Sequence, residues 1–265
     1  MGVSKSGYYE YLGRRKPDQQ MEREALEGFV EDVFLEHKSR YGHRRTDLEP
    51  GRIGIVANEK RVLKIMREKG PEAMGTTRRY RIQKRIEKGD PRADLVERVS
   101  AVSGRNRLWV GDITYVPTRR GFLYLATVMD AFSRKVVGWS MATHMRENLV
   151  IDALEQAVGR ESPSGHDLVF HDDQGTRYTS RASWKALGRH GITQSVSRPG
   201  NPYGNAVVEP LLETPRTELV KGQAYEGPEE ARQEALKYIE PYHDTERMHS
   251  TLGYMSPCDF ERQST

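Results

Sequence analysis

Apolar side chains recur along the first part of the chain with the period of an α-helix. Within residues 21–38 they fall close to 3.6 residues apart, which places them on one helix face. These residues are Leu26, Val30, Val33 and Phe34. A second helix is predicted from residue 59 to residue 69, with Asn58 as its N-cap.

A basic turn is expected between these two helices. Gly42 is followed by His43, Arg44 and Arg45, and glycine is a common turn residue. Pro50-Gly51 comes shortly afterwards and is expected to interrupt any further helix. Two helices around a basic turn form a helix-turn-helix-like pattern, which many small helical modules share.

From about residue 107 the pattern changes to short runs that are rich in β-branched and aromatic residues. Strands are predicted at 108–116, 121–129, 135–141, 167–171 and 192–194. Helices are predicted at 146–158, from the cap Ser180 to Leu187, and at 228–240, ending near Pro241. Three consecutive strands followed by alternating helices and strands predict an α/β fold, a mixed five-stranded sheet flanked by helices.

The composition favours a soluble, cytoplasmic protein. Charged residues make up 30% of the chain and the mean hydropathy is −0.77. No apolar run approaches the roughly 18 residues of a membrane helix, so we expect no membrane contact. Cys258 is the single cysteine, which excludes internal disulfides and cysteine-rich zinc sites and fits a reducing compartment.

Positive charge is concentrated in the first part of the chain. Residues 1–100 contain 23 Lys and Arg against 17 Asp and Glu, whereas residues 101–265 contain 19 against 21. The bases are densest between residues 78 and 88, around Tyr80, and candidate contacts to a DNA backbone are Arg78, Arg79, Arg81, Lys84 and Arg85, together with Arg44 and Arg45. A solvated basic linker would give the same composition.

Three acids stand at the edges of apolar elements. Asp112 lies inside the run 108–116, Asp173 follows the run 167–171 by one residue, and 35 residues lie between Asp173 and Glu209. Each alone reads as an ordinary strand-end, turn or helix-start acid. Together they suggest a site for phosphodiester chemistry, in which three carboxylates hold two divalent ions about 4 Å apart.

Several motifs, in order, resemble the transposases of bacterial insertion sequences, of the type encoded by the downstream frame of a two-frame element (OrfB). The integrase-core motifs are Leu108 to Tyr115, Gly121 to Asp130, Asp172-Asp173-Gln174-Gly175 and Asn205-Ala206-Val207-Val208-Glu209. The N-terminal and C-terminal motifs are Gly2 to Tyr9, Tyr41 to Arg45 and Arg247 to Tyr254. The resemblance therefore covers nearly the whole chain.

The resemblance implies a ribonuclease H-like fold and a DDE transposase. Asp112, Asp173 and Glu209 match the three acids that hold Mg²⁺, for which Mn²⁺ can substitute. In this family a water cuts one strand at the element end, and the freed 3′-hydroxyl attacks a target phosphodiester. The family pattern assigns the second acid to Asp173. Asp172 stands where serine is usual, and its charge could attract metal.

The chain also departs from the family pattern. Gly204 replaces a common aspartate, Pro210 follows Glu209 directly, and Pro215 falls one turn later. These changes, with Pro50, leave open a catalytically impaired DNA-binding remnant. A metal-dependent nuclease of the same fold, which cuts without joining, also stays open, because it would use the same three acids.

The resemblance also implies partners and a domain order. The partners are DNA, an upstream-frame DNA-binding protein or its frameshift fusion, and further copies of this chain on DNA, as for a nucleoid-associated cytoplasmic protein. We expect a helical DNA-binding module at 1–75, a basic linker at 76–100, the catalytic core at 101–222 and a C-terminal segment at 223–265. In that last segment His243, Arg247 and His249 are candidates for phosphate contacts or for a surface role.

Overall fold

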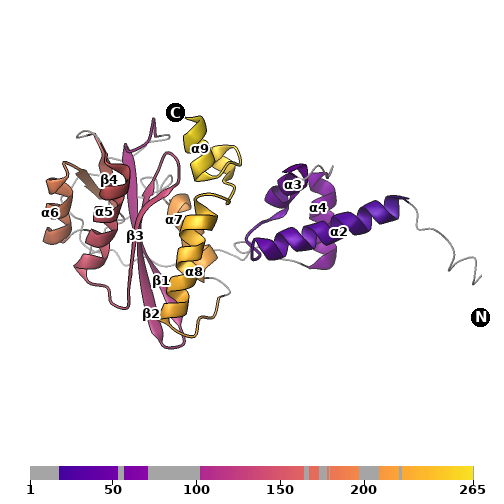
Figure 1. Cartoon of the computed structure of the whole chain (residues 1–265), viewed down its shortest axis with the longest axis horizontal. Coiled ribbons are helices and arrows are strands. Elements are labelled where there is room, and N and C mark those ends of the chain that lie inside the picture. The colour runs from indigo at the N-terminus through magenta and orange to yellow at the C-terminus, as the bar shows by residue number, and fades with distance from the viewer. Residues whose placement is uncertain are drawn as a thin grey trace, which may run out of the picture. The chain divides into compact units, whose positions relative to one another are not determined.

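The structure is a computed structural model that describes residues 18–52, 57–70, 102–163, 167–172, 178, 180–196, 209–220 and 223–264. The chain divides into two compact units, Met1–Arg78 and Arg79–Thr265. Figure 1 labels the helices and strands of both units. Among the described residues, no helix has the length and apolar character that crossing a bilayer requires.

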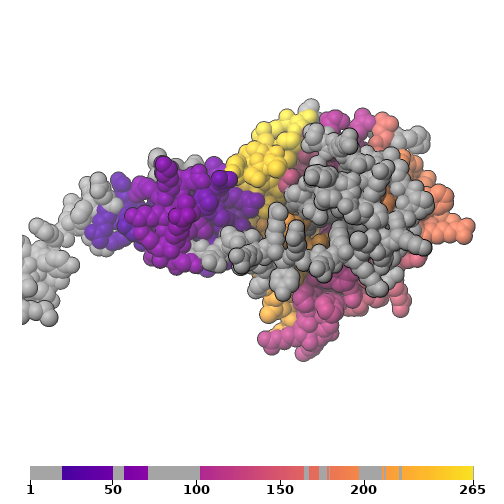
Figure 2. Space-filling model, turned by 180° about the vertical axis from the view of Figure 1, so that it is seen from behind, coloured from indigo at the N-terminus to yellow at the C-terminus, as the bar shows by residue number. Residues whose placement is uncertain are grey.

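Within its described residues the first unit contains the helices α2 (Asp18–Glu36), α3 (His43–Arg52) and α4 (Glu59–Lys69). These helices pack into one body, coloured indigo to purple in Figure 2. Its buried core is Leu26, Val30, Val62, Ile65 and Met66. The α4 prediction is confirmed, since the Asn58 side chain caps the helix by accepting a 2.8 Å hydrogen bond from the Lys60 backbone amide.

The turn predicted around Arg44 and Arg45 is wrong. Both residues lie in α3, which begins at His43 and continues past Pro50 to Arg52. Pro50 is in the last turn of α3, where a missing amide donor removes only one hydrogen bond. The sequence pattern missed this helix because its ten residues, HRRTDLEPGR, contain no apolar stripe.

The second unit is built on a five-stranded sheet in the order β3-β2-β1-β4-β5. The strands are β1 (Leu108–Thr118), β2 (Gly121–Asp130), β3 (Val136–Ala142), β4 (Val169–Asp172) and β5 (Thr193–Val196). β1, β2 and β3 pair antiparallel, whereas β4 pairs parallel with both β1 and β5. This mixed sheet confirms the predicted fold class, and all five predicted strands are present.

Helices cover both faces of the sheet. Figure 1 shows α5 (Glu147–Glu161) and α6 (Arg181–Arg189) on one side, and α7 (Glu209–Val220) and α8 (Pro228–Lys237) on the other. The α5 side holds a large apolar core that includes Trp109, Val128, Leu149 and Phe170. α7 and α8 both pack against β1 on the opposite side. The central strand β1, which carries Asp112, therefore lies between two layers of helices.

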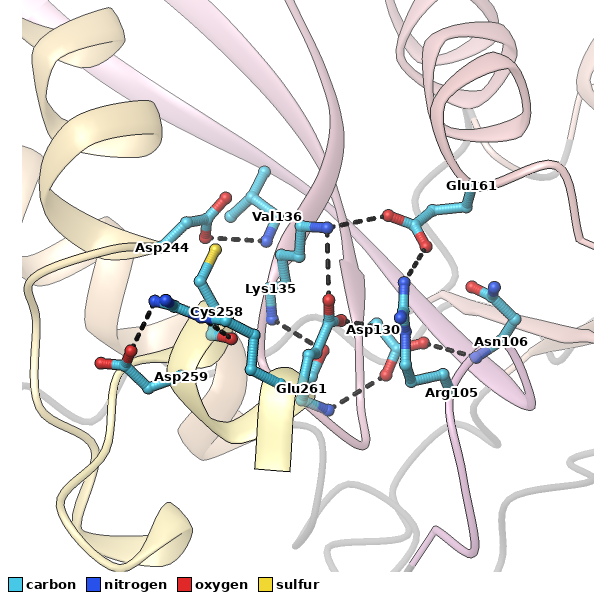
Figure 3. A network of polar contacts seen from close by, with 12 residues as sticks. Arg105, Asn106, Asp130, Lys135, Val136, Glu161, Asp244, Cys258, Asp259 and Glu261 are labelled. Carbon is cyan, nitrogen blue, oxygen red and sulfur yellow. Dashed lines mark hydrogen bonds and ion pairs between the residues drawn. The ribbon is translucent and has the colours of Figure 1, made fainter. Parts of the chain in front are cut away.

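The C-terminal segment is anchored to the sheet by a network of charges (Figure 3). Lys135 Nζ lies 3.1 Å from Glu161 Oε1 of α5 and 3.3 Å from Glu261 Oε2 of α9 (Pro257–Gln263). The Val136 amide donates to Asp244 Oδ1 at 3.0 Å. The start of β3 is thus tied both to α5 and to the end of the chain.

The helix predicted at 228–240 is only partly correct. α8 ends at Lys237 and the chain continues as a π-helix, η1 (Tyr238–His243), with Pro241 inside it. In an α-helix the proline ring would clash with the carbonyl four residues earlier, and the wider turn relieves this clash. The wide turn buries Tyr238, Ile239, Tyr242 and His243.

Candidate active site

Asp112 is a buried carboxylate in the middle of β1, with only 3% of its surface exposed. Because strand side chains alternate, it shares one sheet face with the buried residues Val110, Thr114 and Val116. Thr114 Oγ1 donates to Asp112 Oδ2 at 3.4 Å. A buried negative charge is costly unless hydrogen bonds or a cation compensate it.

That cation is supplied by α7. Arg216 Nη2 lies 2.5 Å from Asp112 Oδ1, and 48% of the Arg216 side chain is exposed. Residues seven apart lie on the same face of a helix, so the face of α7 that carries Glu209 also carries Arg216. Sequence analysis did not single out Arg216, although its spacing from Glu209 was a readable signal.

Asp172 ends β4, directly beside β1. The parallel register pairs it with Gly111, so Asp172 and Asp112 lie on opposite faces of the sheet. Asp172 is fully buried, and Gln194 Nε2 donates to its Oδ2 at 3.0 Å. The sheet therefore lies between the side chains of Asp172 and Asp112, so the two carboxylates cannot share one metal ion.

The other two candidate acids are only partly within the described residues. Asp173 lies outside them, and for Glu209 the structure describes the backbone, as the first residue of α7, but not the side chain. No group of three or more His, Cys, Asp or Glu that could hold a metal occurs among the described residues. What the structure does bring together is β1, the end of β4 and α7, the three elements that precede or carry these acids.

The two prolines of α7 occupy different positions. Pro210 is the second residue of the helix, where proline is well tolerated because its missing amide would have no partner in the helix. Pro215 lies inside α7 and removes one backbone hydrogen bond there. Pro210 at this position is compatible with the helix, and Gly204 lies outside the described residues.

Some of the candidate DNA contacts lie within the described residues and others lie outside them. Arg44 lies 3.3 Å from Glu59, and the Arg45 guanidinium lies 5.6 Å from the centre of the Tyr41 ring. Arg78, Arg79, Arg81, Lys84 and Arg85 lie outside the described residues. Sequence analysis missed a basic stripe on α4, formed by the exposed residues Lys60, Lys64 and Arg67, whose spacing of four and three residues places them on one face.

The C-terminal candidates are buried, which contradicts both a surface role and a contact to DNA phosphates. His243 is 0% exposed, Arg247 2% and His249 4%. Arg247 instead pairs with Glu218 of α7. A partner 29 residues upstream could not be read from the motif alone.

Comparison with known protein families gives three matches. Residues 103–202 match the integrase core domain, residues 190–257 match a second description of the integrase core domain, and residues 21–79 match an HTH-like domain. The first match contains β1 to β5, the second contains α7, α8 and the π-helix, and the third contains most of α2 together with α3 and α4.

Relatives of known name align along nearly the whole chain. The transposase for insertion sequence element IS904 of Lactococcus lactis is 43% identical over 254 residues, 96% of this chain and 100% of the relative. Transposase InsF for insertion sequence IS3A of Escherichia coli is 33% identical over 264 residues, 99% of this chain and 91% of the relative.

Solved structures resemble a smaller part. The catalytic core domain of BIV integrase is 21% identical with a TM-score of 0.44, covering 60% of this chain and 95% of that one. The HTLV-2 integrase catalytic core domain in complex with magnesium is 17% identical with a TM-score of 0.43, covering 59% and 96%.

Proposed function

The chain belongs to the transposases of bacterial insertion sequences that contain an integrase core domain, and on this premise we propose that Asp112, Asp173 and Glu209 form its catalytic metal site. As a DDE-type transposase it mediates the integration of an insertion sequence into DNA. The observation that carries the proposal is the buried Asp112 carboxylate, at the place where β1 meets the end of β4 and the Arg216 face of α7.

The geometry supports Asp173 rather than Asp172 as the second acid. Asp172 lies on the sheet face opposite Asp112 and is bonded to Gln194. Glu209 is seven residues before Arg216 on α7, and Arg216 contacts Asp112. In this proposal the three acids meet beside Asp112, on the sheet face that α7 covers.

The donor chemistry fits a hard divalent cation. Carboxylate oxygens are the ligands that Mg²⁺ prefers, and the buried Asp112 charge already has a cationic partner 2.5 Å away. When bound there, two Mg²⁺ ions, or Mn²⁺ in their place, would stabilise the attacking and leaving oxygens of an in-line phosphodiester displacement. Asp112 lies on a strand and Glu209 begins a helix, and such regular elements give the rigid support that a metal site requires.

The helical unit supports a second part of the proposal, which is DNA binding by residues 1–75 and the basic linker 76–100. The bases of α3, α4 and the linker would neutralise phosphates of the element ends. The catalytic core would occupy 101–222 and the C-terminal segment 223–265. We further propose that an upstream-frame protein or its fusion supplies additional DNA recognition, and that several copies of the chain assemble on DNA in the nucleoid of the cytoplasm.

The experiment is strand cleavage and joining on labelled DNA that carries the element's own ends, with Mg²⁺ or Mn²⁺ and with the upstream-frame fusion. Asp112→Asn is compared with Asp152→Asn, a matched change on the exposed side of α5. Cleavage and joining that disappear only in Asp112→Asn support the proposal. Cutting without joining identifies the nuclease, and DNA binding without any cutting identifies the remnant.

A further inference from the structure

Charged side chains hold α7 from two opposite sides. On one side Arg216 contacts Asp112 of β1. On the other side Glu218 contacts Arg247, which follows the π-helix in the sequence. Successive residues of an α-helix are about 100° apart, so residues 216 and 218 point about 200° apart. A helix that is held by ion pairs on two opposite faces cannot rotate about its axis without breaking one of the ion pairs.

The Glu218–Arg247 ion pair is bidentate and buried. Arg247 Nη2 donates to Glu218 Oε1 at 2.6 Å, and Nε donates to Oε2 at 2.9 Å. Tyr238 OH donates to the same Oε2 at 3.0 Å. Glu218 is 5% exposed and Arg247 2%. Burial alone would lower the pKa of the Arg247 guanidinium, but the Glu218 carboxylate outweighs this and raises that pKa, so the guanidinium stays charged.

The contribution of this ion pair to the stability of the fold does not explain why the chain contains it. Replacing a buried ion pair by apolar residues of similar volume is often neutral or stabilising, because removing two charges from water is costly. A bidentate guanidinium–carboxylate pair does provide a fixed direction, since two parallel hydrogen bonds define the orientation of both groups.

We propose that Arg247 is a positioning residue for the active site, and that its pair with Glu218 fixes the roll of α7 and so places Glu209 against Asp112. The inference rests on the proposed function of Glu209. Glu209 precedes Arg216 by seven residues, so the two lie within about 20° of one helix face. The C-terminal motif that begins at Arg247 thereby acquires a role in catalysis without touching DNA.

A small rotation of α7 about its axis matters because a metal site tolerates only small changes in its metal–ligand distances. Side-chain atoms lie about 5 Å from a helix axis, so a roll of about 20° moves them by about 2 Å. Metal–ligand distances tolerate deviations of only about 0.2 Å. A small rotation of α7 would therefore remove the Glu209 position from a site centred on Asp112, even with the fold intact.

The test measures Mn²⁺ affinity of the full chain by calorimetric titration, with Asp112→Asn showing which binding belongs to the site. The decisive variant is the double change Glu218→Gln with Arg247→Met, which leaves no buried charge unpaired and keeps an amide oxygen to accept from the Tyr238 hydroxyl. We expect its melting temperature to stay near that of the wild type while Mn²⁺ affinity falls at least about tenfold, the effect typical of groups that orient metal ligands.

Leu149→Ala, in the α5 core on the other side of the sheet, is the control for general destabilisation. We expect it to melt earlier and to keep its Mn²⁺ affinity. The positioning role is overturned if the double variant binds Mn²⁺ as the wild type does, or if Leu149→Ala loses as much affinity. A wild-type chain without Asp112-dependent Mn²⁺ binding would instead overturn the metal site itself, and the inference with it.

Discussion

Gly138 of β3 is where the packing of α5 on the sheet is tightest, and Gly138→Ala tests that packing. A Cβ at Gly138 would lie 2.2 Å from the carbonyl oxygen of Ala153 and 2.7 Å from the Cβ and the amide nitrogen of Ala157. These atoms belong mainly to the α5 backbone, which cannot rotate away as a side chain can. The added methyl must therefore push the whole helix away from the strand.

The magnitude follows from the overlap. The added Cβ would overlap the α5 backbone by roughly 1 Å. If α5 moves away from β3 by about that distance, the other atoms that face each other across this contact lose about a quarter to a half of their van der Waals attraction. Overpacking of a close-packed core costs about 1–3 kcal/mol, and a clash with backbone belongs at about 3 kcal/mol. For a unit of this size we expect the melting temperature to fall by about 6–12 °C.

The assay is thermal unfolding followed by circular dichroism, with Gly159→Ala as the matched control. Gly159 lies on the exposed side of α5, and a Cβ there meets no atom within 4 Å. Alanine favours the helix, so this variant should gain about 0.5–1 kcal/mol. A Gly138→Ala chain that melts at or above the wild-type temperature would refute the packing described for α5 and β3.

Three further predictions follow from single contacts. Asn58→Ala removes the cap of α4, costs about 1 kcal/mol, and should speed hydrogen exchange at the first amides of α4, whereas unchanged exchange would exclude the cap. Burial alone would raise the pKa of Glu161, but Lys135 and Arg105 outweigh this and lower that pKa below its ordinary value. The stability gained is present at neutral pH and lost on acidification, so the melting-temperature gap between wild type and Lys135→Met should be wider at pH 7 than at pH 4; an equal gap would contradict this. Arg216→Gln removes one of the two ion pairs that hold α7 and should weaken Mn²⁺ binding by calorimetry, whereas stronger binding would show that the arginine only competes with the ion for Asp112.

The sequence predicted the core elements well because their patterns are local. The strands alternate or run apolar between turn residues, and α4 has both a cap and an apolar stripe. α3 escaped prediction because its packing uses residues such as Thr46, which is fully buried although polar. The π-helix escaped because a proline reads as a helix end, whereas here the burial of Tyr238 and Tyr242 sustains a wider turn.

The motifs predicted the candidate site residues. The tertiary contacts around these residues could not be predicted from the sequence. The pairing of Gly111 with Asp172 decides which sheet face each neighbouring acid occupies, and strand register across sixty residues is not visible in a motif. Arg247 looked like a phosphate ligand because a lone arginine carries no sign of its partner. Its contact with Glu218 depends on how α7 and the C-terminal segment pack.

Asp172 and Asp173 are neighbours in the sequence, and one pair of variants tests most directly which of them serves the active site. Strand joining on the element's own ends should disappear in Asp173→Asn. It should persist in Asp172→Asn, where the asparagine oxygen can still accept the hydrogen bond from Gln194. Loss of joining in Asp172→Asn together with its retention in Asp173→Asn would contradict the account.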